Sequence, residues 1–257
     1  MKEYRRRLRA NSSGQLLIVA ALAIAVLISS TTIYVYELSK ETNGTDTPSI
    51  SNFVLALKQS TKNTMVSSLV NVSNGGEKTV LTANLNELSK VFRSLNHFGI
   101  CHLDFTALDD SAYNSGIWLS WSISGLGVSS AYANFTLKVY GMASNITVNY
   151  AVNITTTVTI DGYYTKLAGN EKQVNLTCKM HNEGEPTLAK NINLFYEKLG
   201  SWIPVNSSNN LSIMDYGNGT YILSFNVNVP SNQVQVSVNV YDLHDIFVQA
   251  NTTCYEA

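Results

Sequence analysis

The chain is short of charged residues, cysteine and proline. Charged side chains make up 14% of its 257 residues, against about 25% in a typical soluble protein. It has four prolines and three cysteines, and no two cysteines form a Cys-x-x-Cys pair. A structural zinc site is therefore not expected, because such sites use paired ligands at short spacing. Asparagine, serine and threonine supply most of the polarity instead.

The sequence signatures of common catalytic sites are missing as well. The chain contains no Gly-x-Ser-x-Gly, no His-Glu-x-x-His, no glycine-rich phosphate loop and no EF-hand ligand series. Beyond residue 9 it has a single arginine, Arg93, and it has four histidines in all. General acid–base catalysis draws on such ionisable groups. We therefore predict that the protein is not an enzyme and that it holds no cofactor and no metal.

One apolar run, Leu16–Tyr36, carries no charged residue. As a helix it would reach about 30 Å, the thickness of the hydrocarbon core of a bilayer. The basic cluster RRRLR at 5–9 precedes it, and positive charge of this kind marks the cytoplasmic flank of a membrane span. We expect a single-pass transmembrane helix at 15–38, with the N-terminus in the cytoplasm and the bulk of the chain extracellular.

The expected extracellular part is acidic. Beyond residue 9 the chain has twelve basic and seventeen acidic residues. Binding of nucleic acid needs a basic face, and docking on anionic lipid needs basic residues at the surface. Neither is therefore expected as a partner of this part of the chain.

The order of a basic segment, Gly14-Gln15 and an uninterrupted apolar run resembles the N-terminus of archaeal type IV pilin-like proteins and their secreted relatives. The resemblance implies that a prepilin peptidase cuts between Gly14 and Gln15 and that the exposed helices bundle into a filament core. Ser13 and Val19 stand where major pilins carry a basic residue and a glutamate. These differences imply a minor, tip-type subunit or an anchored protein that never polymerises. The alternative is a cleaved secretory signal with its cut at 29–32.

Hydrophobic periodicity predicts helices followed by strands. Residues 52–70 have apolar residues at mixed helical spacings, and 79–98 carry a leucine and phenylalanine stripe at steps of three and four. After Gly99 the period changes to two, with alternation around 117–123, 135–139 and 146–160. This order predicts an α+β domain at 52–160 with antiparallel strands.

From Asp161-Gly162 onward, about seven short strand signals alternate with turn residues, which is typical of an immunoglobulin-like β-sandwich. The segment 215–225 resembles the turn and strand of extracellular modules of that kind. The expected fold class is α+β, with an N-terminal transmembrane helix and a C-terminal all-β immunoglobulin-like sandwich. The expected segments are a cytoplasmic basic segment at 1–14, the transmembrane helix at 15–38, a linker at 39–51, the pilin-like α+β domain at 52–160 and the sandwich at 161–257.

Two kinds of covalent modification are expected outside the cell. A disulfide between Cys178 and Cys254 is preferred, because both fall in the last domain, although sequence alone leaves the connectivity open. Ten Asn-x-Ser/Thr triplets follow the apolar run and are candidate glycosylation sites. They begin at Asn43, Asn71, Asn134, Asn145, Asn153, Asn175, Asn206, Asn210, Asn218 and Asn251.

Two clusters of side chains suggest binding. His97, Cys101, His102 and Asp104 are ligand types for zinc or copper, but they lack the paired spacing of tetrahedral sites, and we interpret them as structural. Tyr113, Trp118, Trp121 and the pair Tyr163-Tyr164 could form a face on which a sugar ring stacks, although aromatic residues in strands more often belong to the core.

The sequence thus predicts a non-enzymatic, membrane-anchored cell-surface glycoprotein of archaeal pilin-like type. It would act in surface assembly or adhesion, with other surface or filament subunits as partners. The alternative is a membrane-anchored extracellular receptor or carbohydrate-recognition module, with the aromatic residues as its site.

Overall fold

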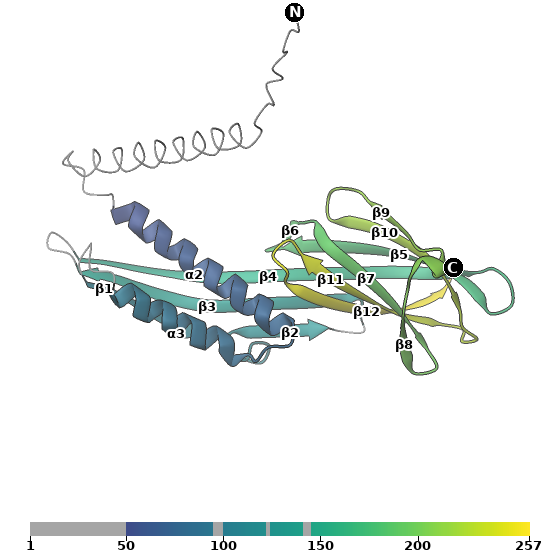
Figure 1. The fold of residues 1–257 in the computed structure, drawn as a ribbon, viewed down its shortest axis with the longest axis horizontal. Helices are drawn as coiled ribbons and strands as arrows, with labels where there is room; N and C mark the ends of the chain where they lie inside the picture. The colour runs from purple at the N-terminus through teal and green to yellow at the C-terminus, as the bar shows by residue number, and fades with distance from the viewer. Residues whose placement is uncertain (1–49, 95–99, 122–123, 141–144) are drawn as a thin grey trace, which may run out of the picture. The chain divides into compact units, whose positions relative to one another are not determined.

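The structure, a computed structural model, describes residues 50–94, 100–121, 124–140 and 145–257 (Figure 1). The chain divides into two compact units between Leu57 and Lys58, and the packing described below concerns the second unit. The expected transmembrane helix at 15–38, the processing site at Gly14-Gln15 and the triplet at Asn43 lie outside the described residues. Within the described residues, no helix is both long enough and apolar enough to cross a bilayer.

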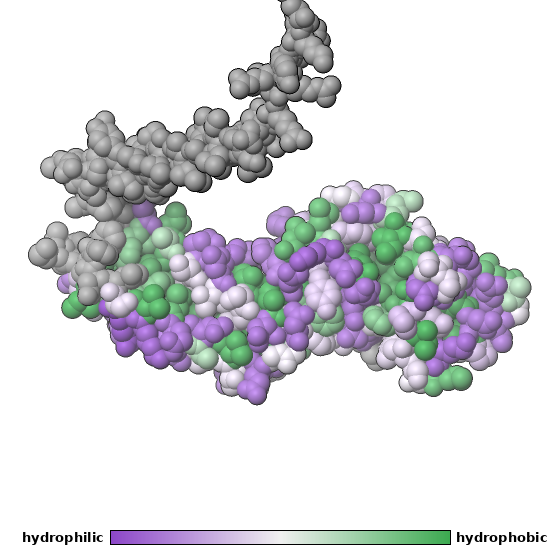
Figure 2. Space-filling model, viewed as in Figure 1, coloured by the Kyte–Doolittle hydropathy of each residue, from purple (hydrophilic) through white to green (hydrophobic). Residues whose placement is uncertain are grey.

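Two helices come first in the described chain, α2 (Ile50–Ser73) and α3 (Thr79–Ser94). They correspond to the helices predicted at 52–70 and 79–98. The stripe on α3 is buried at Leu81, Leu85 and Phe92, while the opposite side of the helix is hydrophilic (Figure 2). The α2 helix ends at an Asn-Gly-Gly turn, where Gly75 takes a positive φ of 100° that favours glycine.

Strands make up more than half of the described residues. Their bounds are β1 (Ile100–Ala107), β2 (Ile117–Trp121), β3 (Leu126–Tyr140), β4 (Asn145–Lys166), β5 (Glu171–Asn182), β6 (Glu185–Pro186), β7 (Ala189–Lys198), β8 (Ser201–Pro204), β9 (Ser212–Asp215), β10 (Thr220–Asn228), β11 (Val234–Asp242) and β12 (Phe247–Glu256), with a 3-10 turn η1 (Ser207–Asn209) before β9.

The strands form one connected sheet system around β4. One series of paired strands runs from β4 through β5 and β10 to β9. A second series runs from β4 through β12, β11 and β7 to β8. The strand β3 also pairs with β4, and β1 and β2 each pair with β3. The link between β4 and β12 is parallel, with Tyr255 opposite Tyr163, and the other pairs are antiparallel. Alternate residues of β5, β10 and β11 are buried, so these strands turn one face to the core.

The α3 helix and the part of α2 from Lys58 onward cover the inner face of β1, β3 and β4 (Figure 1). Ser89 of α3 donates a hydrogen bond to the carbonyl of Leu103 on β1 at 3.0 Å. Thr61 of α2 lies within hydrogen-bond distance, 3.3 Å, of the hydroxyl of Tyr150, whose ring stacks on Phe135 with centroids 5.2 Å apart. The core of this part therefore lies between the helices and β3.

The predicted fold class is wrong. The described chain is mainly a large β-sheet with two helices, rather than an α+β body followed by a separate all-β immunoglobulin-like sandwich, and no described helix could span a membrane. The reason lies at Asp161-Gly162, where the sequence predicts that the second domain begins. Gly162 stays inside β4 opposite Leu176, and a Cβ there would lie 2.4 Å from the carbonyl oxygen of Asn175. Glycine is needed for close packing here, so β4 continues where a domain was expected to begin.

Candidate functional site

Three aromatic residues gather on the outer face of β2 and β3, and we call Tyr113, Trp118 and Tyr132 the aromatic face. The ring centroid of Tyr113 lies 5.7 Å from that of Trp118 and 6.2 Å from that of Tyr132. Trp118 and Tyr132 share one side of the sheet, because Trp118 pairs with Ser130, two residues before Tyr132 on β3. All three side chains are half-buried, so part of each ring faces solvent.

A polar network fixes Tyr113. Its hydroxyl lies 2.9 Å from Ser130 Oγ, which lies 2.6 Å from Thr155 Oγ1. The Thr155 hydroxyl donates to Asn153 Oδ1 at 3.0 Å. The backbone of Tyr113 is held too, since its N–H donates to the Asp110 carboxylate at 2.8 Å. That bond, with a second from a neighbouring backbone N–H, lowers the pKa of Asp110 below its ordinary value.

Three of the predicted aromatic members, Trp121, Tyr163 and Tyr164, lie elsewhere. Trp121 points to the opposite side of β2 from Trp118, and its ring packs edge-on against Phe247 with centroids 5.0 Å apart. Tyr164 is buried, while Tyr163 is 49% exposed. Tyr163 follows Thr155 by eight positions on β4, which places it about 25 Å farther along the strand. None of these three residues belongs to the aromatic face.

Tyr132 is not among the residues that the sequence predicts for this face. The alternation predicts a strand around 135–139, whereas β3 begins at Leu126. Extending the alternation backward from Asn134 would have placed Tyr132 on the same outer side. With this third ring, the face combines apolar ring surface with hydroxyl and amide groups at its border, an arrangement that can stack the apolar side of a sugar ring and bind its hydroxyls.

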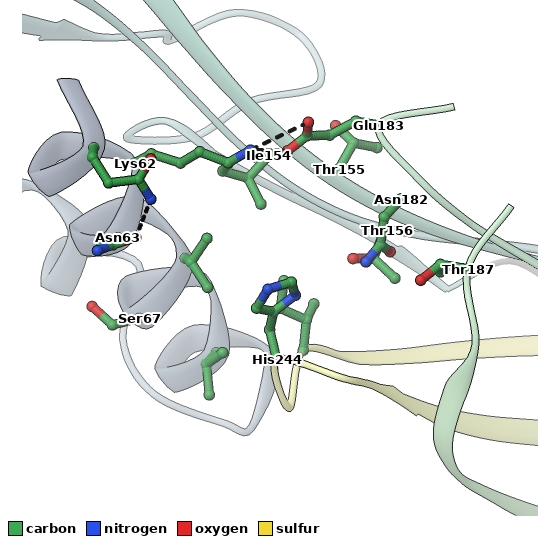
Figure 3. Close-up of a pocket in the computed structure, with 14 residues that line it drawn as sticks. Lys62, Asn63, Ser67, Ile154, Thr155, Thr156, Asn182, Glu183, Thr187 and His244 are labelled. Atoms are coloured by element: carbon green, nitrogen blue, oxygen red, sulfur yellow. Dashed lines mark hydrogen bonds and ion pairs between the residues drawn. The ribbon is translucent and has the colours of Figure 1, made fainter. Parts of the chain in front are cut away.

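A second candidate site is a cleft of about 750 Å³ between α2 and the turns that follow β5 and β11 (Figure 3). Val66 and Val70 of α2 and Ile154 of β4 give it apolar walls. The ion pair between Lys62 and Glu183, with Nζ and Oε1 3.2 Å apart, spans one margin. The cleft therefore has apolar walls and a polar rim.

The carboxylate of Asp242 lies beside this cleft and is fully buried. Its Oδ1 accepts hydrogen bonds from the backbone N–H groups of His244 and Ile246, both at 2.8 Å. Its Oδ2 accepts from Asn182 Nδ2 at 3.0 Å and from Thr156 Oγ1 at 3.4 Å. Because the donors come from three separate segments, Asp242 joins the turn after β11 to β4 and β5.

Two polar side chains of the cleft, Asn182 and His244, lie beside Asp242, and His244 Nδ1 is 3.5 Å from Asp242 Oδ2. Asn182 turns its amide nitrogen to Asp242, and its Oδ1 is buried with no hydrogen-bond partner among the described residues. The imidazole of His244 projects into the cleft (Figure 3) with 61% of its side chain exposed. Of these two side chains, the imidazole is the one that a ligand in the cleft could reach.

Of the histidine, cysteine and aspartate residues interpreted as structural, the described members lie on opposite sides of β1. His97 lies outside the described residues. His102 Nε2 lies 3.0 Å from Asp104 Oδ1 on the outer side of β1, whereas Cys101 is buried on the inner side. Across residues 50–94, 100–121, 124–140 and 145–257, no three histidine, cysteine or acidic side chains are grouped to hold a metal ion.

All three cysteines are buried free thiols in the structure. Burial raises the pKa of Cys178 and of Cys254 to about 12 and also raises that of Cys101. The thiolate is the reactive form, so burial lowers the reactivity of these thiols in the folded protein. The disulfide between Cys178 and Cys254 stays a prediction.

Most of the candidate glycosylation sites are accessible. Of the nine asparagines that the structure describes, seven are exposed and two, Asn175 and Asn251, are half-buried. None is buried in the core, which is a necessary condition for a glycan at these positions.

Comparison with protein families found no matching family model, and comparisons with curated proteins and with solved structures found no significant match. The function is therefore inferred from the residues and the geometry of this chain alone.

Proposed function

We propose that the protein is a non-enzymatic cell-surface protein, attached to the membrane near its N-terminus and acting in surface assembly or adhesion. The observation that carries the proposal is the switch from the basic cluster at 5–9 to the uncharged run Leu16–Tyr36, with Gly14-Gln15 between them. The accessible Asn-x-Ser/Thr triplets agree with an extracellular position for the remaining chain.

Mass spectrometry of the mature N-terminus, on protein isolated from membrane and soluble fractions, tests this proposal. We expect the protein in the membrane fraction with Gln15 as its first residue, because the resemblance to pilin-like proteins implies cleavage after Gly14. A Gly14→Leu variant serves as the matched control and should keep its basic segment while remaining in the membrane. A soluble protein that starts near Thr31 would contradict membrane attachment, and an intact Met1 in the membrane would contradict the pilin-like processing.

The alternative function is carbohydrate recognition, which the aromatic face favours. Trp118→Ala is expected to weaken binding to a glycan at least tenfold, about 1.4 kcal/mol, because it removes one of the rings available for stacking. Glycan-array binding followed by titration calorimetry with the best-bound glycan measures the effect. Trp202→Ala is the matched control, since Trp202 is a 45% exposed tryptophan on β8, away from the aromatic face. Equal binding by both variants would contradict this function.

A further inference from the structure

The strand β4 is paired unequally on its two sides. On one side β3 pairs with it from Asn145 to Thr159. On the other side β5 pairs with it only from Thr156 to Lys166. Residues 145–155 therefore form a strand edge that no other described strand covers, and we call this stretch the open edge.

The direction of the backbone groups along the open edge follows from two backbone hydrogen bonds of β4. The Ile160 N–H donates to the Gly125 carbonyl on the β3 side, and the Thr155 carbonyl accepts from the Glu183 N–H on the β5 side. Backbone groups of successive residues in a strand point to alternate sides. Odd-numbered residues therefore direct their N–H and C=O groups away from β3. These residues are Asn145, Thr147, Asn149, Ala151 and Asn153.

The open edge lacks the features that usually prevent strand pairing. Natural proteins protect edges with charged residues, prolines or bulges, yet 145–155 reads NITVNYAVNIT, without charge, proline or glycine. Its pairing with β3 runs in continuous register. The apolar residues at 146, 148, 150 and 152 are only half-buried on the inner face, so an added strand would cover more of them.

The positive charges close to the open edge have partners within the chain. Lys138 of β3, which pairs with Thr147, lies 3.8 Å from Asp104 Oδ2. Lys58 of α2 lies over the ring of Tyr150, with its Nζ 5.0 Å from the centroid. Lys62 forms its ion pair with Glu183. The open edge is therefore neutral, and two such edges can approach each other without like-charge repulsion between their own residues.

We propose that the open edge pairs antiparallel with the open edge of a second copy of this chain. The Thr155 carbonyl is already occupied, so the pairing uses 145–153 and its two-fold axis passes through Asn149. In this register Asn145 faces Asn153 of the second copy and Thr147 faces Ala151, all with backbone groups directed at the partner strand. The interface is isologous, because the same residues contribute from both copies.

The register also suits the side chains. On the inner face Ile146 meets Val152 of the second copy and Val148 meets Tyr150, which are aliphatic and aromatic pairs that stabilise sheets. On the outer face the two asparagines that begin Asn-Ile-Thr triplets, Asn145 and Asn153, stand opposite each other. Directly opposed side chains lie about 5 Å apart, so a glycan on either residue would exclude the partner strand. Glycosylation at these sites and pairing of the edge are mutually exclusive.

This inference rests on the proposed assembly role, for which it supplies a contact between copies. A charge swap at the two-fold position tests it, with full-length protein lacking glycans, in detergent, by analytical ultracentrifugation. We expect the unaltered protein to form dimers. Asn149→Lys and Asn149→Glu should each raise the dissociation constant at least tenfold, because like charges then face each other at the axis, and an equimolar mixture of the two variants should recover dimers.

Asn149→Gln is the matched control and should dimerise as the unaltered protein does. Thermal melting of every variant shows whether folding is retained, which is expected because Asn149 is exposed. A second readout is Asn149→Cys, which should form a disulfide between copies, since hydrogen-bonded antiparallel pairs hold Cα atoms about 5.5 Å apart. The same substitution at Asn134, exposed on β3, should not.

A monomeric unaltered protein, or a dimer that Asn149→Lys leaves unchanged, would overturn the proposal. So would an Asn149→Cys variant that cross-links in cells to a different protein and never to itself, because the occupant would then be a strand of another partner. None of these outcomes bears on the mature N-terminus, so failure of the edge contact is distinguishable from failure of the membrane-attached surface role.

Discussion

Asp242→Ala is expected to lower the free energy of unfolding by about 3–5 kcal/mol. The substitution leaves two backbone N–H groups, the amide of Asn182 and the hydroxyl of Thr156 without their shared acceptor. Hydrogen bonds to a charged group contribute about 1.5–3 kcal/mol each, and buried donors without partners add a desolvation cost. For a unit of this size the melting temperature should fall by about 10 °C, measured by circular dichroism.

The neighbouring Asp245 provides the matched control. Its carboxylate lies 2.6 Å from Lys190 Nζ in an exposed ion pair, and such pairs contribute at most about 1 kcal/mol. Asp245 has a positive φ of 68°, which asparagine tolerates better than alanine. The control is therefore Asp245→Asn, with a change in melting temperature within about 4 °C. Equal effects at the two positions would contradict the role assigned to Asp242.

Gly127→Ala should lower the free energy of unfolding by an amount similar to that expected for Asp242→Ala, but for a different reason. A Cβ at Gly127 would lie 2.2 Å from the carbonyl oxygen of Gln249 and 2.8 Å from Val248 Cγ1. The obstacle is backbone of β12, so a side-chain rotation cannot relieve it. Overpacking of this kind costs about 3 kcal/mol or more, and we expect a fall of about 6–12 °C in melting temperature.

Gly169→Ala is the control for Gly127→Ala. Gly169 has a positive φ of 57° and nothing within 4 Å of an added Cβ, so alanine there costs only about 1 kcal/mol of backbone strain. Differential scanning calorimetry of both variants separates a steric clash from a conformational cost. If Gly127→Ala melts at or above the temperature of Gly169→Ala, β3 and β12 do not approach each other as closely as described.

Local patterns in the sequence predicted the individual elements well. The stripe of Leu81, Leu85 and Phe92 predicted α3, because residues three and four apart share one side of a helix. Alternation predicted β4, but not its continuation beyond 160, since a glycine inside a strand looks the same as a glycine in a turn until its neighbours are known. The parallel link to β12 had no local signal at all.

The candidate sites were predictable only where their residues are close in sequence. Tyr113 and Trp118 were identified together because five positions separate them, whereas Tyr132 depended on the register of β3. Asp242 and its acceptor role toward Thr156 and Asn182 could not be predicted, because these residues lie 86 and 60 positions away. The open edge required knowledge of where β5 stops pairing, which is set by tertiary structure.

The length of β4 has a mechanical consequence. Its 22 residues extend about 70 Å, and β3, β5 and β12 all pair with it. Hydrogen bonds in a sheet run perpendicular to the strands, so tension applied along β4 loads many of them simultaneously in shear instead of peeling them apart one by one. Pulling along β4 would therefore meet more resistance than a force that separates its neighbouring strands from one end.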